Sequence, residues 1–405
     1  MTKYGRSPWL DQFPKSRVPS YPKYRGPSTT EVVVVGGGLT GCATAYALAA
    51  AGLKTILLEA EQIGRGETAR SSGWLADEPG VSFDALENAV GLRQARRAWQ
   101  AWRRAALDFA SLLRRLDTRC FLEPRESFLV ARTPEQLTRL RKDLKARTEA
   151  GTDASFVKAR VVAATTGLEA AGGLRAREGA TIDPYRACIG LAAAARDRGA
   201  QLFERSPVRR ITFTRKHADV IAAGGVIRTR RAVIATGLPT DLFRSLARHF
   251  WFHTRFLVLT DPIPAKIRRQ LGDPTVIVRD LAEPAHVVRR FADDRLLISG
   301  ADSDLLPPRQ RDKVVVQRTG QLMYELSTLY PDVSGVQPAY GWWSDYGRTA
   351  EGIPYIGPHR NFPHHLFAFG DSSHGVTAAY LASRILLRHC SEEMDPADEA
   401  FGFHR

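Results

Sequence analysis

The sequence predicts an α/β fold in which a Rossmann-like nucleotide-binding unit is combined with a second, mixed α and β domain. Three observations support this prediction. Residues 32–59 read as strand, glycine-rich turn, helix and strand. A second strand, glycine-containing turn and helix is expected at residues 366–388. Between them, residues 255–299 contain short apolar runs separated by Pro and Asp, which indicates antiparallel strands without a βαβ rhythm.

The first unit has the pattern of a dinucleotide-binding turn. Gly36 is expected to make the tight turn, Gly38 to let the backbone approach a pyrophosphate, and Gly41 to bring helix and strand close together. The phosphates would lie on the free N–H groups of the helix N-terminus. Glu59 ends the next strand, where its carboxylate can accept hydrogen bonds from both ribose hydroxyls. Because it would repel a 2′-phosphate, an unphosphorylated adenosine ribose is expected. The alternative, a turn without ligand, is disfavoured because strand, helix and acid all occur at the expected spacing.

Composition bounds the class of protein. The 405 residues suggest two or three domains, and 44% hydrophobic with 25% charged residues is typical of a soluble globular chain. The net charge of +15 could indicate an anionic partner such as nucleic acid or a membrane surface. Because the arginines are spread along the whole chain, a solvated basic surface is preferred and nucleic-acid binding is considered unlikely.

Cysteine usage and the amino terminus indicate location. The four cysteines contain no C-x-x-C pair, which favours free buried thiols in a reducing compartment over disulfides, and no metal site is predicted. Residues 1–27 lack the apolar region of a signal peptide, and the longest apolar run is too short to span a bilayer. We therefore expect a cytoplasmic protein without a membrane span.

The remaining elements follow in chain order. Residues 1–27 contain five prolines and several aromatic residues, so we expect an extended, ordered arm lying along the folded body. The small-residue loop 64–73 could wrap a ligand, with its arginine and serine side chains reaching phosphate, or could be a plain surface loop. Residues 92–116 repeat apolar positions every three or four residues, which predicts a long amphipathic helix.

Two capped helix starts and a hairpin are also predicted. Thr133-Pro134 and Asp183-Pro184 have a capping residue before a proline, so helices should begin there and end near Gly151 and Gly199. Residues 201–211 are predicted as one strand containing Val208, and residues 226–235 as another that closes with a turn. Asp293-Asp294 is expected at the tip of a hairpin.

The ordered set of motifs resembles the D-amino-acid oxidase superfamily of FAD-dependent oxidoreductases, and looks most like its branch of gamma-glutamylputrescine oxidoreductase, glycine oxidase and sarcosine oxidase-like proteins. The resemblance spans residues 32–388. It rests on Gly36-x-Gly38-x-x-Gly41 with Glu59, Arg70-Ser71-Ser72-Gly73, Asp183-Pro184, Ile234-Ala235-Thr236-Gly237, Ile353-Pro354-x-Ile356-Gly357 and Gly370-x-x-x-His374-Gly375-Val376.

The resemblance implies two domains behind the arm of residues 1–27. Residues 28–83, 181–249 and 336–405 would form a discontinuous FAD-binding domain of the FAD/NAD(P) type. Residues 84–180 and 250–335 would form an inserted substrate domain whose mixed antiparallel sheet roofs the flavin. The cofactor-binding residues implied are Gly36, Gly38, Leu39, Thr40, Gly41, Glu59, Arg70, Ser71, Ser72, Gly73, Val208, Thr236, Gly237, Gly370, His374, Gly375 and Val376.

Such enzymes oxidise the C–N bond of an amine or amino acid by hydride transfer to flavin N5, giving an imine that water hydrolyses. The flavin carries this chemistry, so an obligatory side-chain base is not expected, and His374 is the candidate catalytic side chain. His249, His253 and His286 could serve as acid or base, but structural roles are preferred for them. Arg289, Arg290 and Arg348 are candidate substrate anchors because a guanidinium can bind a carboxylate in bidentate fashion. Neighbours on a strand face opposite ways, so at most one of Arg289 and Arg290 should enter the cavity.

Two departures from relatives matter. The cysteine or histidine through which some relatives attach FAD has no counterpart here, so non-covalent FAD is predicted. Between Arg255 and Tyr346 the only lysines are Lys266 and Lys313, both expected in loops, although several oxidases keep a lysine over the flavin. The electron acceptor, O2 or another molecule, therefore stays open. Two alternatives also stay open: a tRNA-modifying flavoprotein domain, and a non-catalytic FAD-binding subunit of a hetero-oligomeric dehydrogenase.

Overall fold

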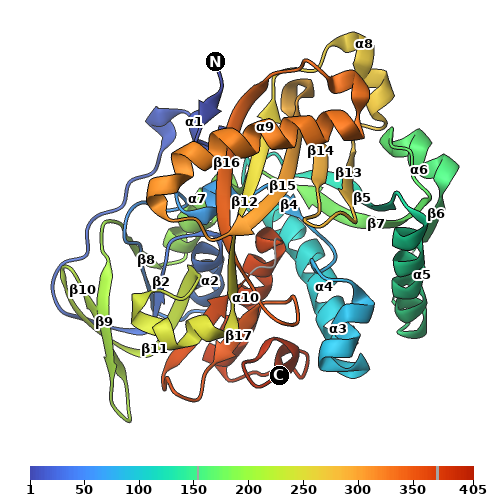
Figure 1. Cartoon of the computed structure of the whole chain (residues 1–405). Helices are drawn as coiled ribbons and strands as arrows, with labels where there is room; N and C mark the ends of the chain where they lie inside the picture. Colours follow the sequence, from blue (N-terminus) through green and yellow to red (C-terminus); the bar gives the residue numbers. More distant parts are fainter. Residues whose placement is uncertain (153–154, 371–373) are drawn as a thin grey trace.

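The computed structural model describes residues 1–152, 155–370 and 374–405, and these are arranged around two β-sheets. Figure 1 shows helix α9 (Arg311–Leu329) lying across one sheet, and α2 (Leu39–Ala50) and α10 (Gly375–Ser391) beside the other. The α/β fold class with a mixed second sheet is confirmed. Of the predicted Gly370 to Val376 turn, Asp371, Ser372 and Ser373 lie outside the described residues.

The smaller sheet is mostly parallel and carries the nucleotide-binding unit. Its central strand β2 pairs in parallel with β3 on one side and with β11 on the other. The chain order therefore reverses at β2, which is where ligands bind in open α/β sheets. The strand order is β17 (Tyr355–Pro358), β18 (His365–Phe369), β11 (Gly225–Gly237), β2 (Ser28–Val35), β3 (Thr55–Leu58) and β8 (Gln201–Phe203), with β10 (Ala218–Ala222) and β9 (Val208–Phe213) continuing from β11.

The valine run of β2 divides between two cores because side chains alternate along a strand. Val32 and Val34 pack in the core that includes α2, α7 (Pro184–Asp197) and α10. Val33 and Val35 pack on the opposite face with residues of β11, β18 and η3 (Asp241–His249). A continuous apolar run was needed because both faces of this strand are covered.

The larger sheet is mixed and lies opposite the carboxyl ends of the parallel strands. Its strand order is β1 (Lys3–Tyr4), β16 (Pro338–Arg348), β12 (Trp251–Thr260), β15 (Leu296–Asp304), β14 (Val287–Arg290), β13 (Val276–Asp280), β5 (Glu123–Ala131), β7 (Gly172–Thr181) and β4 (Trp74–Leu75), with β6 (Ser155–Lys158) also on β7. Helix α9 covers one face, and Phe256 and Val258 of β12 pack beneath it. Leu257 and Leu259 point to the other face.

The remaining helices flank these sheets. The amphipathic helix α4 (Leu92–Arg115) packs against α10 and α3 (Phe83–Val90). Helix α5 (Pro134–Glu149) packs against α3, and α6 (Ala159–Thr166) against β7. Thr133 and Asp183 accept hydrogen bonds from the main-chain nitrogens of Gln136 and Arg186, so both predicted helix caps are confirmed.

The amino-terminal arm is ordered along the body, as predicted. Its strand β1 pairs with β16, and its short helix α1 (Pro8–Asp11) buries Trp9. Further along, Tyr21 and Tyr24 are also buried, and their main-chain nitrogens donate to Glu204 and Ser206. The arm therefore contacts both sheets.

Several predicted boundaries are corrected. Residues 201–211 are two strands, β8 and β9, because the chain turns through Arg205 with a φ of 50°. Lys266 and Lys313 lie in helices, α8 (Ala265–Arg268) and α9, and not in loops. The Asp293-Asp294 turn does join β14 to β15.

Strand pairing also bears on where domains divide. β16 falls within the range 336–405 that the sequence assigned to the FAD-binding domain, yet it pairs with β12 and β1 in the larger sheet. β4, from the range 28–83, likewise pairs with β7 in that sheet. The division into domains remains a proposal, and a boundary after β16 describes these pairings better.

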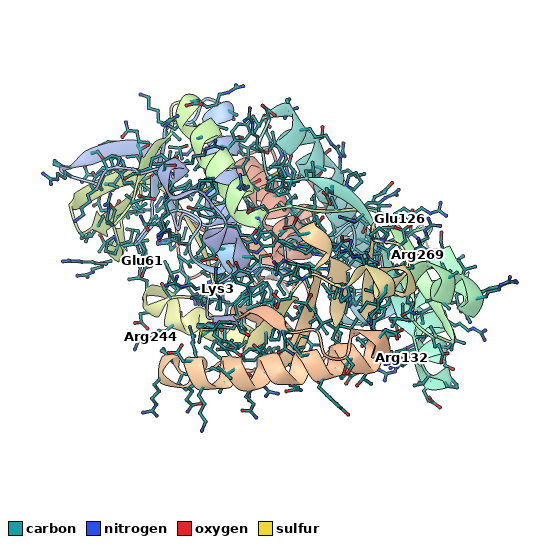
Figure 2. All side chains as sticks on the ribbon, turned by 90° about the horizontal axis from the view of Figure 1, so that it is seen from above. Lys3, Glu61, Glu126, Arg132, Arg244 and Arg269 are labelled. Carbon is teal, nitrogen blue, oxygen red and sulfur yellow. The ribbon has the colours of Figure 1, made fainter. Side chains whose placement is uncertain are left out.

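Basic side chains occur at both ends of the molecule. Figure 2 shows Arg244 on the left, and Arg132 and Arg269 on the right. No helix in the described part of the chain is long and apolar enough to cross a lipid bilayer. All four cysteines are buried and free.

Candidate active site

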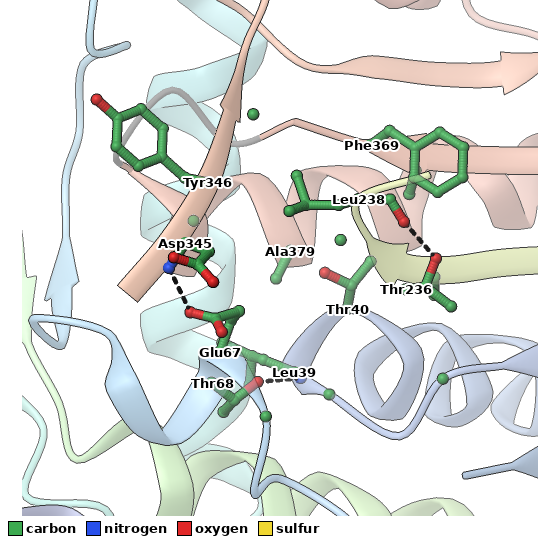
Figure 3. Close-up of a pocket in the computed structure, with 18 of the residues that line it drawn as sticks. Leu39, Thr40, Glu67, Thr68, Thr236, Leu238, Asp345, Tyr346, Phe369 and Ala379 are labelled. Atoms are coloured by element: carbon green, nitrogen blue, oxygen red, sulfur yellow. Dashed lines mark hydrogen bonds between the residues drawn. The ribbon is translucent and has the colours of Figure 1, made fainter. Parts of the chain in front are cut away.

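One cavity of about 690 Å³ lies between the two sheets. The carboxyl ends of the parallel strands and the helices α2 and α10 form one wall, and strands of the larger sheet form the other. Figure 3 shows residues of both walls around the same space: Thr40 of α2 and Ala379 of α10 on one side, and Tyr346 of β16 on the other. The cavity therefore joins the predicted nucleotide site to the face of the larger sheet that lies away from α9.

The glycine turn fits the roles predicted for it. Gly36 has a φ of 107°, which favours glycine. A Cβ at Gly41 would lie 1.9 Å from the carbonyl oxygen of Gly36, so only glycine lets α2 start this close to β2. Gly38 lines the cavity at the N-cap of α2 and carries no side chain that would cover the helix end.

Glu59 lies at the end of β3 beside this turn. One carboxylate oxygen accepts a 2.6 Å hydrogen bond from the nitrogen of Gly37, and the other a 2.8 Å bond from Glu61. A carboxylate has about four acceptor positions, so lone pairs remain for ribose hydroxyls. Val208, the predicted adenine contact, lines the same end of the cavity.

The loop of residues 64–73 runs along the cavity, and Arg70, Ser71 and Ser72 line it. Its carbonyl oxygens are held by groups from distant segments. The indoles of Trp342 and Trp9 donate to the carbonyls of Arg70 and Ser71, each at 2.9 Å. Arg289 donates to the carbonyl of Ser72 at 2.7 Å. We call residues 70–73 the cofactor loop.

Gly73 closes the cofactor loop without lining the cavity. Its φ is 74°, and a Cβ there would lie 2.3 Å from the carbonyl oxygen of Ile182. The carbonyl of Gly73 in turn accepts from the nitrogen of Ile182 at 2.8 Å. Gly73 thus fixes the loop to the segment before α7, and its contact with the cofactor stays a prediction.

Glu67 connects this loop region to the larger sheet. Its carboxylate accepts 2.8 Å hydrogen bonds from the hydroxyl of Ser344 and the nitrogen of Asp345, the second of which is drawn in Figure 3. The side chain of Glu67 is 42% exposed, but the exposed part faces the cavity, which protein atoms surround. This confinement raises the pKa of Glu67 to about 7, although Arg70 at 3.5 Å opposes the rise.

His374 lies at the N-cap of α10 and lines the cavity. Its Nδ1 lies 3.0 Å from the carbonyl oxygen of Glu78, so Nδ1 must carry the proton and donate. Its ring packs 4.6 Å from that of Trp74. Burial, with the nearby cation of Arg279, lowers the pKa of His374 to about 3, so the imidazole is neutral at physiological pH.

The other predicted cofactor contacts come together here. Residues from both predicted strand–turn–helix units line the same cavity, although they are more than 300 positions apart in the sequence. The lining includes Gly36, Gly38, Leu39, Thr40, Glu59, Arg70, Ser71, Ser72, Val208, Thr236, Gly237, Gly370, His374, Gly375 and Val376.

The three predicted substrate anchors are not brought to this cavity. Arg348 is exposed at the end of β16. Arg290 points away, where it donates to the carbonyl of Arg268 and lies 3.5 Å from Asp294. Arg289 reaches the cofactor loop from behind. Neither Arg289 nor Arg290 lines the cavity, in agreement with the expectation that at most one of them would enter it, and their role as substrate anchors stays a prediction.

A different polar group lies at the larger sheet. Arg255 of β12 and Tyr346 of β16 line the cavity, and both bind Asp302 of β15. Arg255 makes two hydrogen bonds to this carboxylate, at 2.9 and 2.7 Å, and the hydroxyl of Tyr346 makes one at 2.6 Å. Sequence reasoning missed this group because its members come from three strands and share no local spacing.

A family model now places this geometry among known proteins. The model described as FAD dependent oxidoreductase matches residues 31–388, which is most of the chain and includes every strand of the smaller sheet except the start of β2. The chain belongs to this family. Its cofactor is therefore FAD, and the protein is an oxidoreductase.

Individual relatives also match over most of both chains. The chain is 28% identical to gamma-glutamylputrescine oxidoreductase of Escherichia coli over 91% of this chain and 85% of that protein. It is 24% identical to glycine oxidase of Bacillus licheniformis over 86% of this chain and 89% of that protein. The crystal structure of glycine oxidase from Geobacillus kaustophilus superimposes with a TM-score of 0.73 at 18% identity, covering 91% and 96% of the two chains, so the fold is shared.

The residues present fit FAD. A Cβ at Gly36 would lie 2.6 Å from the carbonyl oxygen of Ala235 in β11, and one at Gly41 would lie 1.9 Å from the carbonyl oxygen of Gly36, so both positions of the turn require glycine. Gly38 at the N-cap carries no side chain, which leaves the N-terminus of α2 open to phosphates in the cavity. The second helix N-terminus, at Gly375, faces the same cavity. Glu59 would hold the ribose of the adenosine half, and the cofactor loop with α10 would hold the other half. When bound, FAD supplies the hydride acceptor.

Proposed function

We propose that the protein oxidises the C–N bond of an amino acid or amine, by hydride transfer from the carbon that bears nitrogen to flavin N5. The nitrogen lone pair forms the C=N bond of an imine, and water then releases the carbonyl compound and the amine or ammonia. The names of the relatives, gamma-glutamylputrescine oxidoreductase and glycine oxidase, support an amino substrate. The observation that carries the proposal is the cavity that the glycine turn and the larger sheet line together.

The wall on the larger sheet has the composition of a small-substrate site. Leu257, Val287 and Ser299 line it from β12, β14 and β15, together with Trp74. This largely apolar surface would exclude water from the reacting carbon, and a few polar groups would set orientation. Arg255 and Tyr346 stand at the same end, and we propose that they orient the polar part of the substrate. Their shared partner Asp302 keeps both in place.

His374 would act as an acceptor and not as a proton carrier. Because Nδ1 donates to the carbonyl of Glu78, only Nε2 has a free lone pair. With a pKa of about 3 the ring gains no proton at neutral pH. It can therefore accept a hydrogen bond from an N–H group, while the substrate amine must arrive neutral so that its lone pair can form the C=N bond.

The electron acceptor is part of the same proposal. Neither Lys266 nor Lys313 lines the cavity, so the structure supplies no lysine from this segment to assist oxygen. Reoxidation of reduced enzyme by air and by an artificial quinone, compared at equal concentration, would separate an oxidase from a dehydrogenase.

The test is anaerobic mixing of FAD-loaded protein with matched pairs of compounds. Each pair contains an amine and the hydroxy compound of the same skeleton, for example glycine with glycolate. Amino acids, N-methyl amino acids and γ-glutamyl polyamine conjugates form the panel. The proposal expects the visible flavin absorbance to bleach with at least one amine and not with its hydroxy partner. Bleaching by hydroxy compounds alone would refute C–N oxidation. A chain that holds FAD but is never reduced would favour a non-catalytic subunit.

A further inference from the structure

Arg289 is a buried cation without an acidic partner. Its residue is 6% exposed, and its guanidinium forms no ion pair with any residue in the described ranges. Besides the 2.7 Å bond to the carbonyl of Ser72, it makes only a long contact of 3.5 Å to the carbonyl of Arg290. Its Nε has no hydrogen-bond partner among the described residues. The rings of Phe291 and Trp9 lie 5.4 and 6.0 Å from its carbon centre.

Two other arginines with little solvent exposure are paired with carboxylates. Arg147, with 3% of its side chain exposed, binds the carboxylates of Asp143 and Glu78. Arg255 binds Asp302. Burying a charge without a counter-charge is costly, and a single neutral carbonyl does not offset that cost. Burial and the neighbouring cation of Arg125 lower the pKa of Arg289 to about 9, with Glu123 opposing, so the group still carries its charge at neutral pH.

The position of this charge indicates what it faces. Ser72 lines the cavity, and Arg289 binds its carbonyl from behind, so one peptide group separates the guanidinium from the ligand space. Val287, two positions earlier on the same face of β14, lines the cavity directly. A negatively charged ligand beside the cofactor loop would supply this missing counter-charge.

We propose that Arg289 is a positioning residue whose charge, acting through the cofactor loop, stabilises negative charge on bound FAD. FAD carries such charge permanently on its pyrophosphate and gains more on two-electron reduction. The shared chemistry is an anion beside residues 70–73. Trp9 and Trp342 hold the two preceding carbonyls of the loop, but they are neutral, so the charge is supplied by Arg289 alone among these three donors.

The test compares holoenzymes of wild type, Arg289→Gln, Arg289→Lys and Arg295→Gln. Arg295 is a matched control from the same hairpin. It also donates to a main-chain carbonyl, that of Thr260 at 3.0 Å, but this carbonyl belongs to β12 and not to the cofactor loop, and Arg295 has the carboxylate of Asp261 at 3.5 Å. Two quantities are measured: the rate at which FAD fluorescence appears after dilution, and the midpoint potential from dye-equilibrated reduction.

Loss of the charge in Arg289→Gln should accelerate FAD release on the order of tenfold, or lower the midpoint potential, while Arg289→Lys stays near wild type. Faster release with an unchanged potential would assign the charge to the pyrophosphate, and a lowered potential would assign it to the reduced ring. Unchanged release and potential in Arg289→Gln would overturn the proposal, as would an equal effect in Arg295→Gln. If Arg289→Gln does not fold, Arg289→Lys decides alone: losses in that variant would show that geometry and not charge matters.

Discussion

The contact between Gly41 and Gly36 gives the sharpest prediction for the cofactor site. In Gly41→Ala the new Cβ would start 1.9 Å from the carbonyl oxygen of Gly36 and 3.0 Å from its carbon. An ordinary contact needs 3.4 Å or more, so turn and helix would have to separate by about 1.5 Å. The obstacle is main chain, which cannot rotate away as a side chain can.

The surroundings leave no room for that movement. Helix α2 packs against α7 and α10, and Cys42, Ala45 and Leu48 on it are completely buried. Overpacking of a well-packed core costs about 1–3 kcal/mol and occasionally more, so we expect a loss in the free energy of unfolding of roughly 3 kcal/mol. The phosphate-binding turn would be displaced by the same movement, and FAD would be lost.

Denaturant unfolding and the flavin-to-protein absorbance ratio of purified protein measure both effects. The control is Gly320→Ala in the middle of α9, where a Cβ meets nothing within 4 Å. That change should be neutral or stabilise the helix by up to about 1 kcal/mol, with full FAD content. A Gly41→Ala protein that retains FAD stoichiometrically and unfolds within about 1 kcal/mol of wild type would refute the reasoning.

Three further predictions address chemistry, pH and attachment. His374→Ala should slow anaerobic flavin reduction by at least about tenfold because the change removes an acceptor in the cavity, and it should also lower the temperature of thermal unfolding because a buried ring and its hydrogen bond to Glu78 are lost; unchanged reduction kinetics would make His374 purely structural. Burial raises the pKa of Asp77 from 3.8 to about 6. Between about pH 4 and about pH 6 the carboxyl is therefore protonated in the folded state but has lost its proton in the unfolded state. The free energy of unfolding should fall as the pH rises from about 4 to about 6. The Asp77→Asn variant can still accept the hydrogen bond from the nitrogen of Glu178, so it should not show this fall. In urea titrations above about pH 6 it should be more stable than wild type by at most about 3 kcal/mol. Parallel pH profiles of the two proteins would contradict this prediction. Acid-denatured protein should release its yellow colour into the supernatant, and colour that stays with the pellet would show covalent FAD.

Features encoded locally could be predicted from the sequence. Thr133 and Asp183 each cap a helix by accepting a hydrogen bond from the main-chain nitrogen three residues later. The residues that determine such a cap are therefore neighbours in the sequence. The turn from Gly36 to Gly41 is equally local, and Glu59 follows at a spacing fixed by one helix and one strand. The hairpin at Asp293-Asp294 also depends only on neighbouring residues.

Features that depend on contacts between distant strands could not be predicted from the sequence. β12 pairs with β16 across more than 70 positions, and no periodicity in either strand names its partner. Arg255, Asp302 and Tyr346 meet only because their three strands are adjacent. The predicted anchors were chosen by residue type, and type does not distinguish Arg348 on the surface from Arg255 at the cavity. Trp9, far from the loop in sequence, holds Ser71 through the same kind of long-range contact.

The most direct test of the account uses an amine that bleaches the flavin, carrying deuterium on the carbon next to nitrogen. Rapid anaerobic mixing of the labelled and unlabelled compounds measures the rate of flavin reduction, and mass spectrometry of the carbonyl product measures the label. Breakage of that C–H bond in hydride transfer predicts slower reduction of the labelled compound and a product that has lost one deuterium from that carbon. Equal rates with no deuterium lost from that carbon would contradict oxidation of the C–N bond.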